Sequence, residues 1–152
     1  MLAIQNQGFR MRVWSNEKKN VKMPPALRSY LKKDYFPIFK KVKKIGLIKT
    51  SKNASIKLIR RLLEREIPIL AEVHSNTWFK VNKWPPQETH VVVSVGYNKG
   101  KFIINDPYMP YFGKNGQEIE VSLAHFKKSW EAPLYYKNTM CILEKRTAIP
   151  EA

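Results

Sequence analysis

The spacing of apolar residues changes at Pro68, and no other feature of the sequence constrains the fold as strongly. Before this proline the apolar residues recur at helical intervals, and the clearest stripe consists of Tyr35, Ile38, Phe39, Val42 and Ile45. After it come apolar runs of strand length that are separated by turn residues. Helical segments followed by an antiparallel sheet predict an α+β domain.

The expected elements follow from this periodicity and from the residues that start and end each segment. We expect a strand over 8–14, helices over 26–33, 35–45 and 54–66, and Asn53 as the cap of the last of these helices. We further expect strands over 67–73, 90–97, 101–105, 118–121 and 134–144, a loop over 74–89 and a short helix over 122–130. The turn residues Asn98-Lys99-Gly100 should join two of these strands in a hairpin.

Length and composition indicate one folded domain. The chain has 152 residues, of which 43% are hydrophobic and 26% are charged, as in ordinary globular proteins. We expect a single domain over 1–152, with a basic, mainly helical part over 1–66, an antiparallel part over 67–144 and a tail over 145–152. No apolar run approaches the roughly 20 residues of a spanning helix, and the start of the chain lacks the pattern of a signal peptide. The sequence therefore predicts a cytoplasmic protein.

Cysteine and histidine are sparse. Cys141 is the single cysteine of the chain, so no internal disulfide and no cysteine-based zinc cluster can form. His74, His90 and His125 do not have the spacing of a helix-borne metal site. We therefore expect no metal and no cofactor, and we expect His74 and His125 to be structural or surface residues.

The charge of the chain is high and unevenly distributed. Lys and Arg number 28 against 12 Asp and Glu, a formal net charge of +16, and residues 1–66 alone hold 18 basic and 4 acidic side chains. This asymmetry predicts either a polyanionic partner, namely nucleic acid, an anionic membrane surface or an acidic protein, or a solvated face. The candidate polyanion contacts are Arg10, Arg12, Lys40, Lys41, Lys43 and Lys44. No base-reading motif accompanies them, so the sequence indicates only salt-sensitive, non-specific binding.

His90 and Asp106 are the candidate pair for acid–base chemistry. His90 begins one strand of the predicted hairpin and Asp106 follows the end of the other, so the two residues should lie at the same end of the sheet. An imidazole that is held by a carboxylate keeps one tautomer and can act as a general base. The alternative is that His90 is a hydrogen-bonded strand-end residue and that Asp106 only forms the turn before Pro107.

The block that contains this pair resembles a known family. A proline-initiated strand, His-Val-Val-Val-Ser-Val-Gly-Tyr, a turn, Phe-Ile-Ile-Asn-Asp-Pro and a helix with Phe126 and Trp130 follow one another. This succession, over about residues 36–144, resembles the bacteriocin-processing, double-glycine cysteine peptidases of peptidase family thirty-nine. The resemblance implies a papain-like fold, with an N-terminal helical lobe packed on a C-terminal antiparallel sheet. It also implies a Cys-His-Asp triad in which His90 is the base and Asp106 orients it.

The nucleophile of that family is missing. The family has a Cys followed by Gly at the start of a helix, and a Gln some six residues earlier. Gln5 and Gln7 are present here, but no Cys follows either of them. Three explanations are open: the chain is a pseudoenzyme, or the Cys lies upstream of Met1 in a longer protein, or Cys141 serves as the nucleophile from the last strand.

The sequence therefore predicts a degenerate or incomplete papain-like cysteine peptidase domain that binds an extended peptide and is inactive as this chain. Trp78, Trp84, Gly96 and Tyr97 are the candidate residues of the peptide cleft, although aromatic residues in such a loop also close cores. The alternative function is a small basic protein associated with nucleic acid, in which His90 and Asp106 have no catalytic role.

Overall fold

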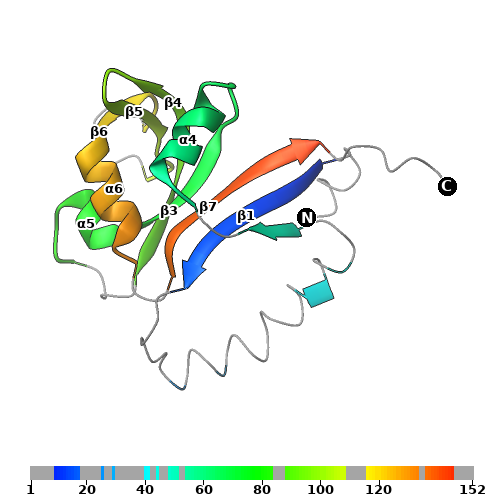
Figure 1. Ribbon diagram of the computed structural model, residues 1–152. Coiled ribbons are helices and arrows are strands. Elements are labelled where there is room, and N and C mark those ends of the chain that lie inside the picture. Colours follow the sequence, from blue (N-terminus) through cyan, green and yellow to red (C-terminus); the bar gives the residue numbers. More distant parts are fainter. Residues whose placement is uncertain are drawn as a thin grey trace.

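The computed structural model describes residues 9–17, 25, 29, 40–41, 44, 48–51, 54–83, 88–108, 116–133 and 136–145. Seven strands in these ranges form one sheet with the order β2-β1-β7-β3-β4-β5-β6 (Figure 1). The strands are β1 (Phe9–Glu17), β2 (Ile48–Ser51), β3 (Ile69–His74), β4 (Thr89–Asn98), β5 (Lys101–Asn105), β6 (Ile119–Ser122) and β7 (Tyr136–Lys145). Neighbouring strands are antiparallel except β1 and β2, which are parallel.

Three helices of the described ranges lie over the part of the sheet that runs from β3 to β6. They are α4 (Ile56–Leu63), α5 (Ser75–Phe79) and α6 (Leu123–Glu131). The long β1–β7 pair extends away from these helices (Figure 1). None of the helices in the described ranges is long and apolar enough to cross a membrane.

The core lies between the helices and one face of the sheet. Along β3 the alternate residues Ile69, Ala71 and Val73 are fully buried, whereas the residues between them are partly exposed. Aromatic rings of β5 and α6 meet above these residues, with 4.3 Å between the ring centroids of Phe102 and Phe126. Burial therefore alternates along β3, and one face of this strand lies in the core.

A serine hydroxyl starts α4. Ser55 accepts a hydrogen bond of 3.1 Å from the amide of Leu58, so Ser55 is the N-cap and the predicted cap Asn53, which lies outside the described residues, is wrong. Ile59, Leu62 and Leu63 face the core. The helix ends where Glu66 adopts a positive φ of 56° and the amide of Ile67 bonds the carbonyl of Leu62.

Ser55→Ala is expected to lower the free energy of unfolding by about 1 kcal/mol, because the amide of Leu58 loses its acceptor. Urea denaturation measures this loss. Ser55→Asp serves as the control, since a carboxylate also caps a helix and should retain the stability. Equal losses in both variants would show that the hydroxyl does not act as a cap.

Most predicted elements of the second half are confirmed. The helix predicted over 54–66 is α4, and the strands and helix predicted over 67–73, 90–97, 101–105, 118–121, 122–130 and 134–144 are β3, β4, β5, β6, α6 and β7. The predicted loop over 74–89 is wrong in part, because α5 occupies its start. The strand β2 was not expected. Pro25, Ser29, Lys40, Lys41 and Lys44 are helical, but most of the predicted helical lobe lies outside the described residues, and its packing on the sheet stays a prediction.

Candidate functional site

The β4–β5 hairpin brings His90 and Asp106 to the same end of the sheet. Lys99 and Gly100 have positive φ values of 46° and 82°, as the two central residues of a tight hairpin turn require. The pairing of Asn98 with Lys101 closes the turn. From this turn the two strands run back side by side toward the candidate pair.

A register shift in β4 decides which face His90 occupies. On the turn side of the shift Tyr97 pairs with Phe102, and beyond it Ser94 pairs with Ile104, so β4 carries one extra residue. Asp106 follows Phe102 and Ile104 in alternation and therefore faces the same side as they do. His90 faces that side too, because the extra residue exchanges the faces of the remaining β4 side chains.

Asp106 is the centre of the candidate site. Its side chain is 0% exposed, and its Oδ1 atom lies 2.7 Å from Nε2 of His90. The indole Nε1 of Trp78 donates to Oδ2 at 2.7 Å, and the amide of Tyr108 donates to Oδ1 at 2.8 Å. Burial alone would raise the pKa of Asp106, but the hydrogen bonds from His90, Trp78 and Tyr108 outweigh it and lower that pKa below its usual value.

The ionised carboxylate sets the tautomer of His90. A carboxylate only accepts hydrogen bonds, so Nε2 of His90 must carry the proton that points at Asp106. In the neutral imidazole the lone pair is then on Nδ1. Nδ1 makes no hydrogen bond with the described part of the chain, and the His90 side chain is 16% exposed. The arrangement therefore presents a basic nitrogen on the side of the ring that faces away from Asp106.

His125 of α6 supports Trp78 from the other side. Nε2 of His125 lies 2.9 Å from the carbonyl oxygen of Trp78 and must donate to it. The two rings are stacked, with 5.6 Å between their centroids. His74 begins α5, since its Nδ1 accepts from the amide of Thr77. The expectation that His74 and His125 are structural fits these contacts.

Two more aromatic rings flank His90. The ring of Phe79 lies 5.1 Å from the imidazole and that of Tyr108 lies 6.3 Å from it, measured between centroids. Phe79 and Tyr108 also contact each other edge to face at 5.5 Å. Tyr108 is 42% exposed, so these rings form an aromatic edge at the surface of the candidate site.

Comparison of the sequence with models of protein families identifies the family of the chain. The model of the Peptidase C39 like family matches residues 5–137, which is most of the chain. The chain belongs to this peptidase family. No curated protein matches the sequence. The predicted resemblance is therefore confirmed, and the sheet with its His90–Asp106 pair belongs to a cysteine-peptidase-like domain.

Two of the predicted cleft residues lie far from His90. Gly96 and Tyr97 lie near the opposite end of β4, about 20 Å away at the rise of a strand. Tyr97 packs on Phe102 and lies under the guanidinium of Arg60. Gly96 and Tyr97 therefore do not contact His90, and their part in a peptide cleft stays a prediction. Trp78 does lie at the site, but it is 1% exposed and its indole N–H donates to Asp106. Trp84 lies outside the described residues.

Cys141 cannot act with His90. On β3, Val73 pairs with His90 and Leu70 pairs with Cys141. Paired residues share a face, and positions three apart on a strand face opposite sides, so the thiol and the imidazole point to opposite faces of the sheet. Burial also raises the pKa of the Cys141 thiol, which disfavours the nucleophilic thiolate. The explanation that Cys141 replaces the family's nucleophile is wrong.

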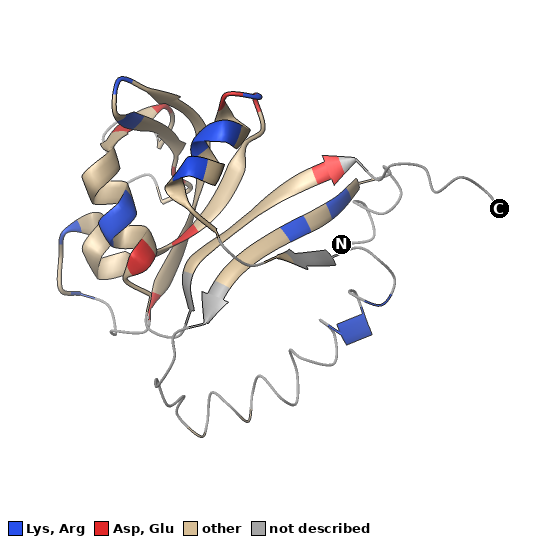
Figure 2. Cartoon of the chain, in the orientation of Figure 1, with Lys and Arg blue, Asp and Glu red and all other residues tan. Residues whose placement is uncertain are grey.

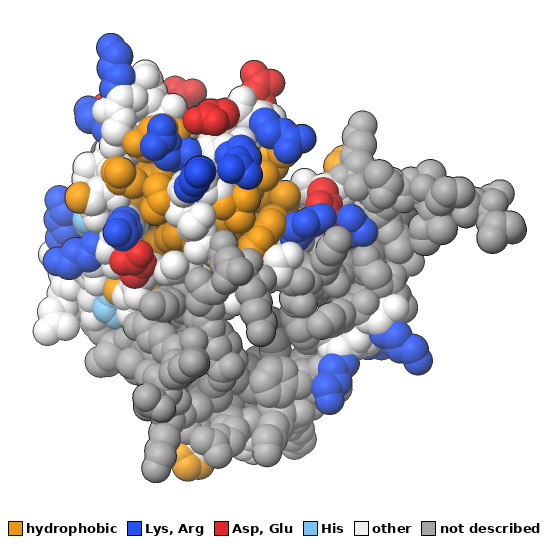
Figure 3. Space-filling view, viewed as in Figure 1, with side chains coloured by type: hydrophobic (Ala, Val, Ile, Leu, Met, Phe, Trp, Pro, Cys, Tyr) orange, Lys and Arg blue, Asp and Glu red, His pale blue; other side chains and the backbone are white. Residues whose placement is uncertain are grey.

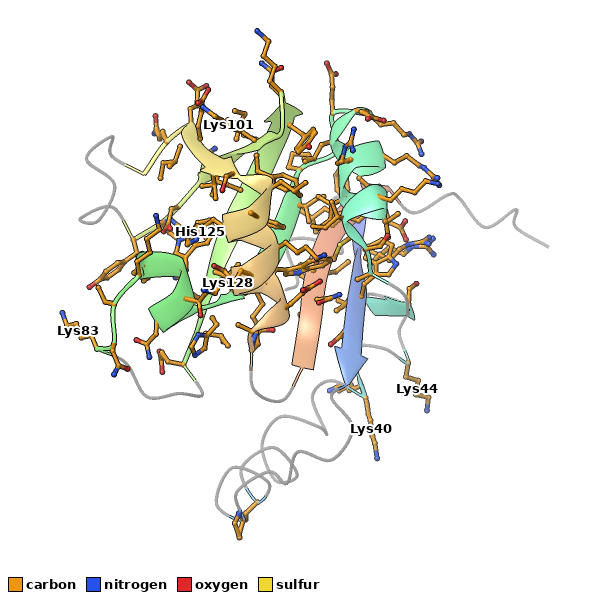
Figure 4. All side chains as sticks on the ribbon, turned by 60° about the vertical axis from the view of Figure 1, so that its left-hand side comes forward. Lys40, Lys44, Lys83, Lys101, His125 and Lys128 are labelled. Carbon is orange, nitrogen blue, oxygen red and sulfur yellow. The ribbon has the colours of Figure 1, made fainter. Side chains whose placement is uncertain are left out.

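The predicted polyanion contacts differ in their surroundings in the described chain, because two arginines pair with a carboxylate and the described lysines are exposed. Arg10 and Arg12 donate to the two carboxylate oxygens of Glu144 at 2.6 and 3.0 Å. Burial would raise the pKa of Glu144, but these guanidinium groups lower it. Lys40, Lys41 and Lys44 are exposed, and Figure 4 shows Lys40 and Lys44 well apart from His125. Lys43 lies outside the described residues.

Proposed function

We propose that the chain is a degenerate or incomplete cysteine peptidase domain that binds an extended peptide beside His90. The observation that carries this proposal is the buried Asp106 carboxylate, which fixes the His90 tautomer and leaves Nδ1 facing away from it. This is the geometry that a general base needs in order to take a proton from a thiol. Membership of the peptidase family also supports a peptidase-like domain.

The single cysteine is the reason to propose binding without cleavage. Thiol proteolysis requires a thiolate beside the imidazole. Cys141 is the only thiol in the sequence and lies on the opposite face of the sheet. His90 and Asp106 are then remnants of a Cys-His-Asp triad, and the surrounding site keeps a role in peptide binding.

Tyr108 and Phe79 are the residues that we assign to peptide contact. Exposed aromatic rings on a fixed scaffold supply apolar contact area at little cost in conformational entropy. Tyr108 lies next to the imidazole and is the exposed member of the aromatic edge. A peptide bound there would run past Nδ1 of His90.

Titration calorimetry with the full chain tests this function. The probe is a synthetic peptide with a Gly-Gly pair, chosen from the resemblance to double-glycine peptidases, and ionic strength is kept high to suppress charge-driven binding. Tyr108→Ala should weaken binding about fivefold or more. Val91→Ala is the matched control, because Val91 is 46% exposed but faces the other side of the sheet. Absence of binding, equal loss in both variants, or cleavage of the peptide would contradict the proposal.

A further inference from the structure

The solvent side of α4 carries a group of exposed cations that the candidate site does not use. They are Lys57, Arg60, Arg61 and Arg65, and we call them the α4 basic face. Figure 2 marks Lys and Arg positions along the ribbon of α4, and Figure 3 shows Lys and Arg side chains gathered on this face of the molecule. Glu64 and Glu66 are the acidic residues of the same segment, so the local charge is positive.

Part of the α4 basic face forms a row. Lys57 and Arg61 are four residues apart and lie about 6 Å from each other along one side of the helix. Arg65 continues this direction in the turn that closes α4, so the row is about 12 Å long. Duplex DNA carries about seven phosphate charges over that length. A row of three cations can therefore face several phosphates at once.

Arg60 stands beside the row and is held in place. Its guanidinium lies 4.6 Å from the centroid of the Tyr97 ring. This contact restricts the side chain before binding, so less conformational entropy is lost when its N–H groups bond an anion. Arg10 and Arg12 lie on the same side of the sheet as α4, and in the described part of the chain both pair with the one carboxylate of Glu144, which leaves a net positive charge nearby.

From these observations we propose that the α4 basic face binds the phosphate backbone of duplex nucleic acid. Arginine side chains match phosphate oxygens in bidentate geometry. In the described part of the chain, the exposed large apolar residues are Val91, Tyr108 and Leu143. Val91 and Leu143 face the other side of the sheet, and Tyr108 lies by His90, so none of them can insert into a bilayer from this face. Tyr97 is covered by Arg60, which disfavours base stacking and hence a single strand.

This binding is independent of the proposed peptide function. Tyr97 and Arg60 mark the turn end of β4, and His90 marks its other end. Loss of one activity should leave the other intact.

Fluorescence anisotropy with the full chain and a mixed-sequence DNA duplex tests the proposal. For about four phosphate contacts, one for each cation of the α4 basic face, the logarithm of affinity should fall with the logarithm of salt concentration with a slope of about −3.6. Arg61→Gln combined with Arg65→Gln leaves Lys57 and Arg60 and should bring this slope to about −1.8. These two substitutions leave the contact between Arg60 and Tyr97 in place, so circular dichroism should show an unchanged fold.

The matched control removes the same charge elsewhere. Lys127→Gln with Lys128→Gln acts on exposed residues of α6, and Lys128 lies apart from α4 in Figure 4. This variant should keep the slope of the unaltered chain, and so should Lys40→Gln with Lys41→Gln. Equal loss in all three variants would mean that only net charge matters and would overturn the proposal. Tighter binding to polyglutamate or to phosphatidylserine vesicles than to the duplex would assign the face to another partner and overturn it as well.

Discussion

Asp106→Ala is expected to lower the free energy of unfolding by about 3–5 kcal/mol at neutral pH. The substitution leaves three N–H donors without their acceptor: the ring of His90, the indole of Trp78 and the amide of Tyr108. A buried donor without an acceptor costs its full desolvation penalty. Urea denaturation of the two proteins measures the difference, and a loss below about 1 kcal/mol would contradict the central place of this carboxylate.

The same carboxylate predicts a pH dependence. The pKa of Asp106 is lowered in the folded chain, so its charge stabilises the fold above the pKa of the unfolded chain. This contribution is lost as the pH falls through the lower, folded pKa. Asp106→Asn keeps the shape of the side chain without the charge, so its stability difference from the unaltered protein should shrink in acid. A difference that stays constant from neutral pH into strong acid would contradict the assignment.

The pairing of His90 with Asp106 could be predicted from the sequence because it depends on local features. The residues Asn98-Lys99-Gly100 determine the hairpin turn, and the apolar runs on either side determine the strands. Together they bring the first residues of β4 near the end of β5. The turn and the strand order place the pair at one end of the sheet, but they do not determine the face that His90 occupies.

That face depends on the extra residue in β4, which the sequence did not reveal. Val91 to Val95 read as a uniform apolar run, apart from Ser94, and give no sign of where a strand will bulge. Gly96 next to the shift is the one available signal, because a glycine inside a strand often marks a bulge. A Cβ atom on Gly96 would lie 3.3 Å from Cγ1 of the Ile103 side chain, a tight contact that also favours glycine here.

Other features depend on contacts between distant parts of the chain. The parallel pairing of β1 with β2 joins residues 11–14 to residues 48–51, and periodicity within one segment cannot predict its neighbours. Gly96 and Tyr97 share a strand with His90, but the length of β4 separates them from it. One general rule could have indicated the role of Trp78 from the sequence. A buried indole needs an acceptor for its N–H group, and here that acceptor is Asp106.

Trp78→Ala should be nearly as damaging as loss of Asp106, with a decrease of about 3–5 kcal/mol in the free energy of unfolding, because it empties a fully buried site. Trp78→Phe separates packing from hydrogen bonding. It retains most of the ring volume but removes the donor to Oδ2 of Asp106, so the expected loss is about 1–3 kcal/mol. Since this donor lowers the pKa of Asp106, that pKa should rise in Trp78→Phe toward its value in the unfolded chain. The stability that the Asp106 charge contributes should then be smaller, and its loss in acid should be complete at a higher pH.

Trp130→Phe is the control for this prediction. Trp130 is as buried as Trp78, and its indole donates at 2.9 Å to the carbonyl of Thr139, so the two substitutions remove the same kinds of contact. Nuclear magnetic resonance of the Asp106 carboxyl carbon across a pH titration distinguishes them. The pKa should rise in Trp78→Phe and stay unchanged in Trp130→Phe, although both variants lose stability. If the Asp106 pKa is the same in both, Trp78 serves only to fill space, and the carboxylate is held ionised by His90 and the Tyr108 amide alone.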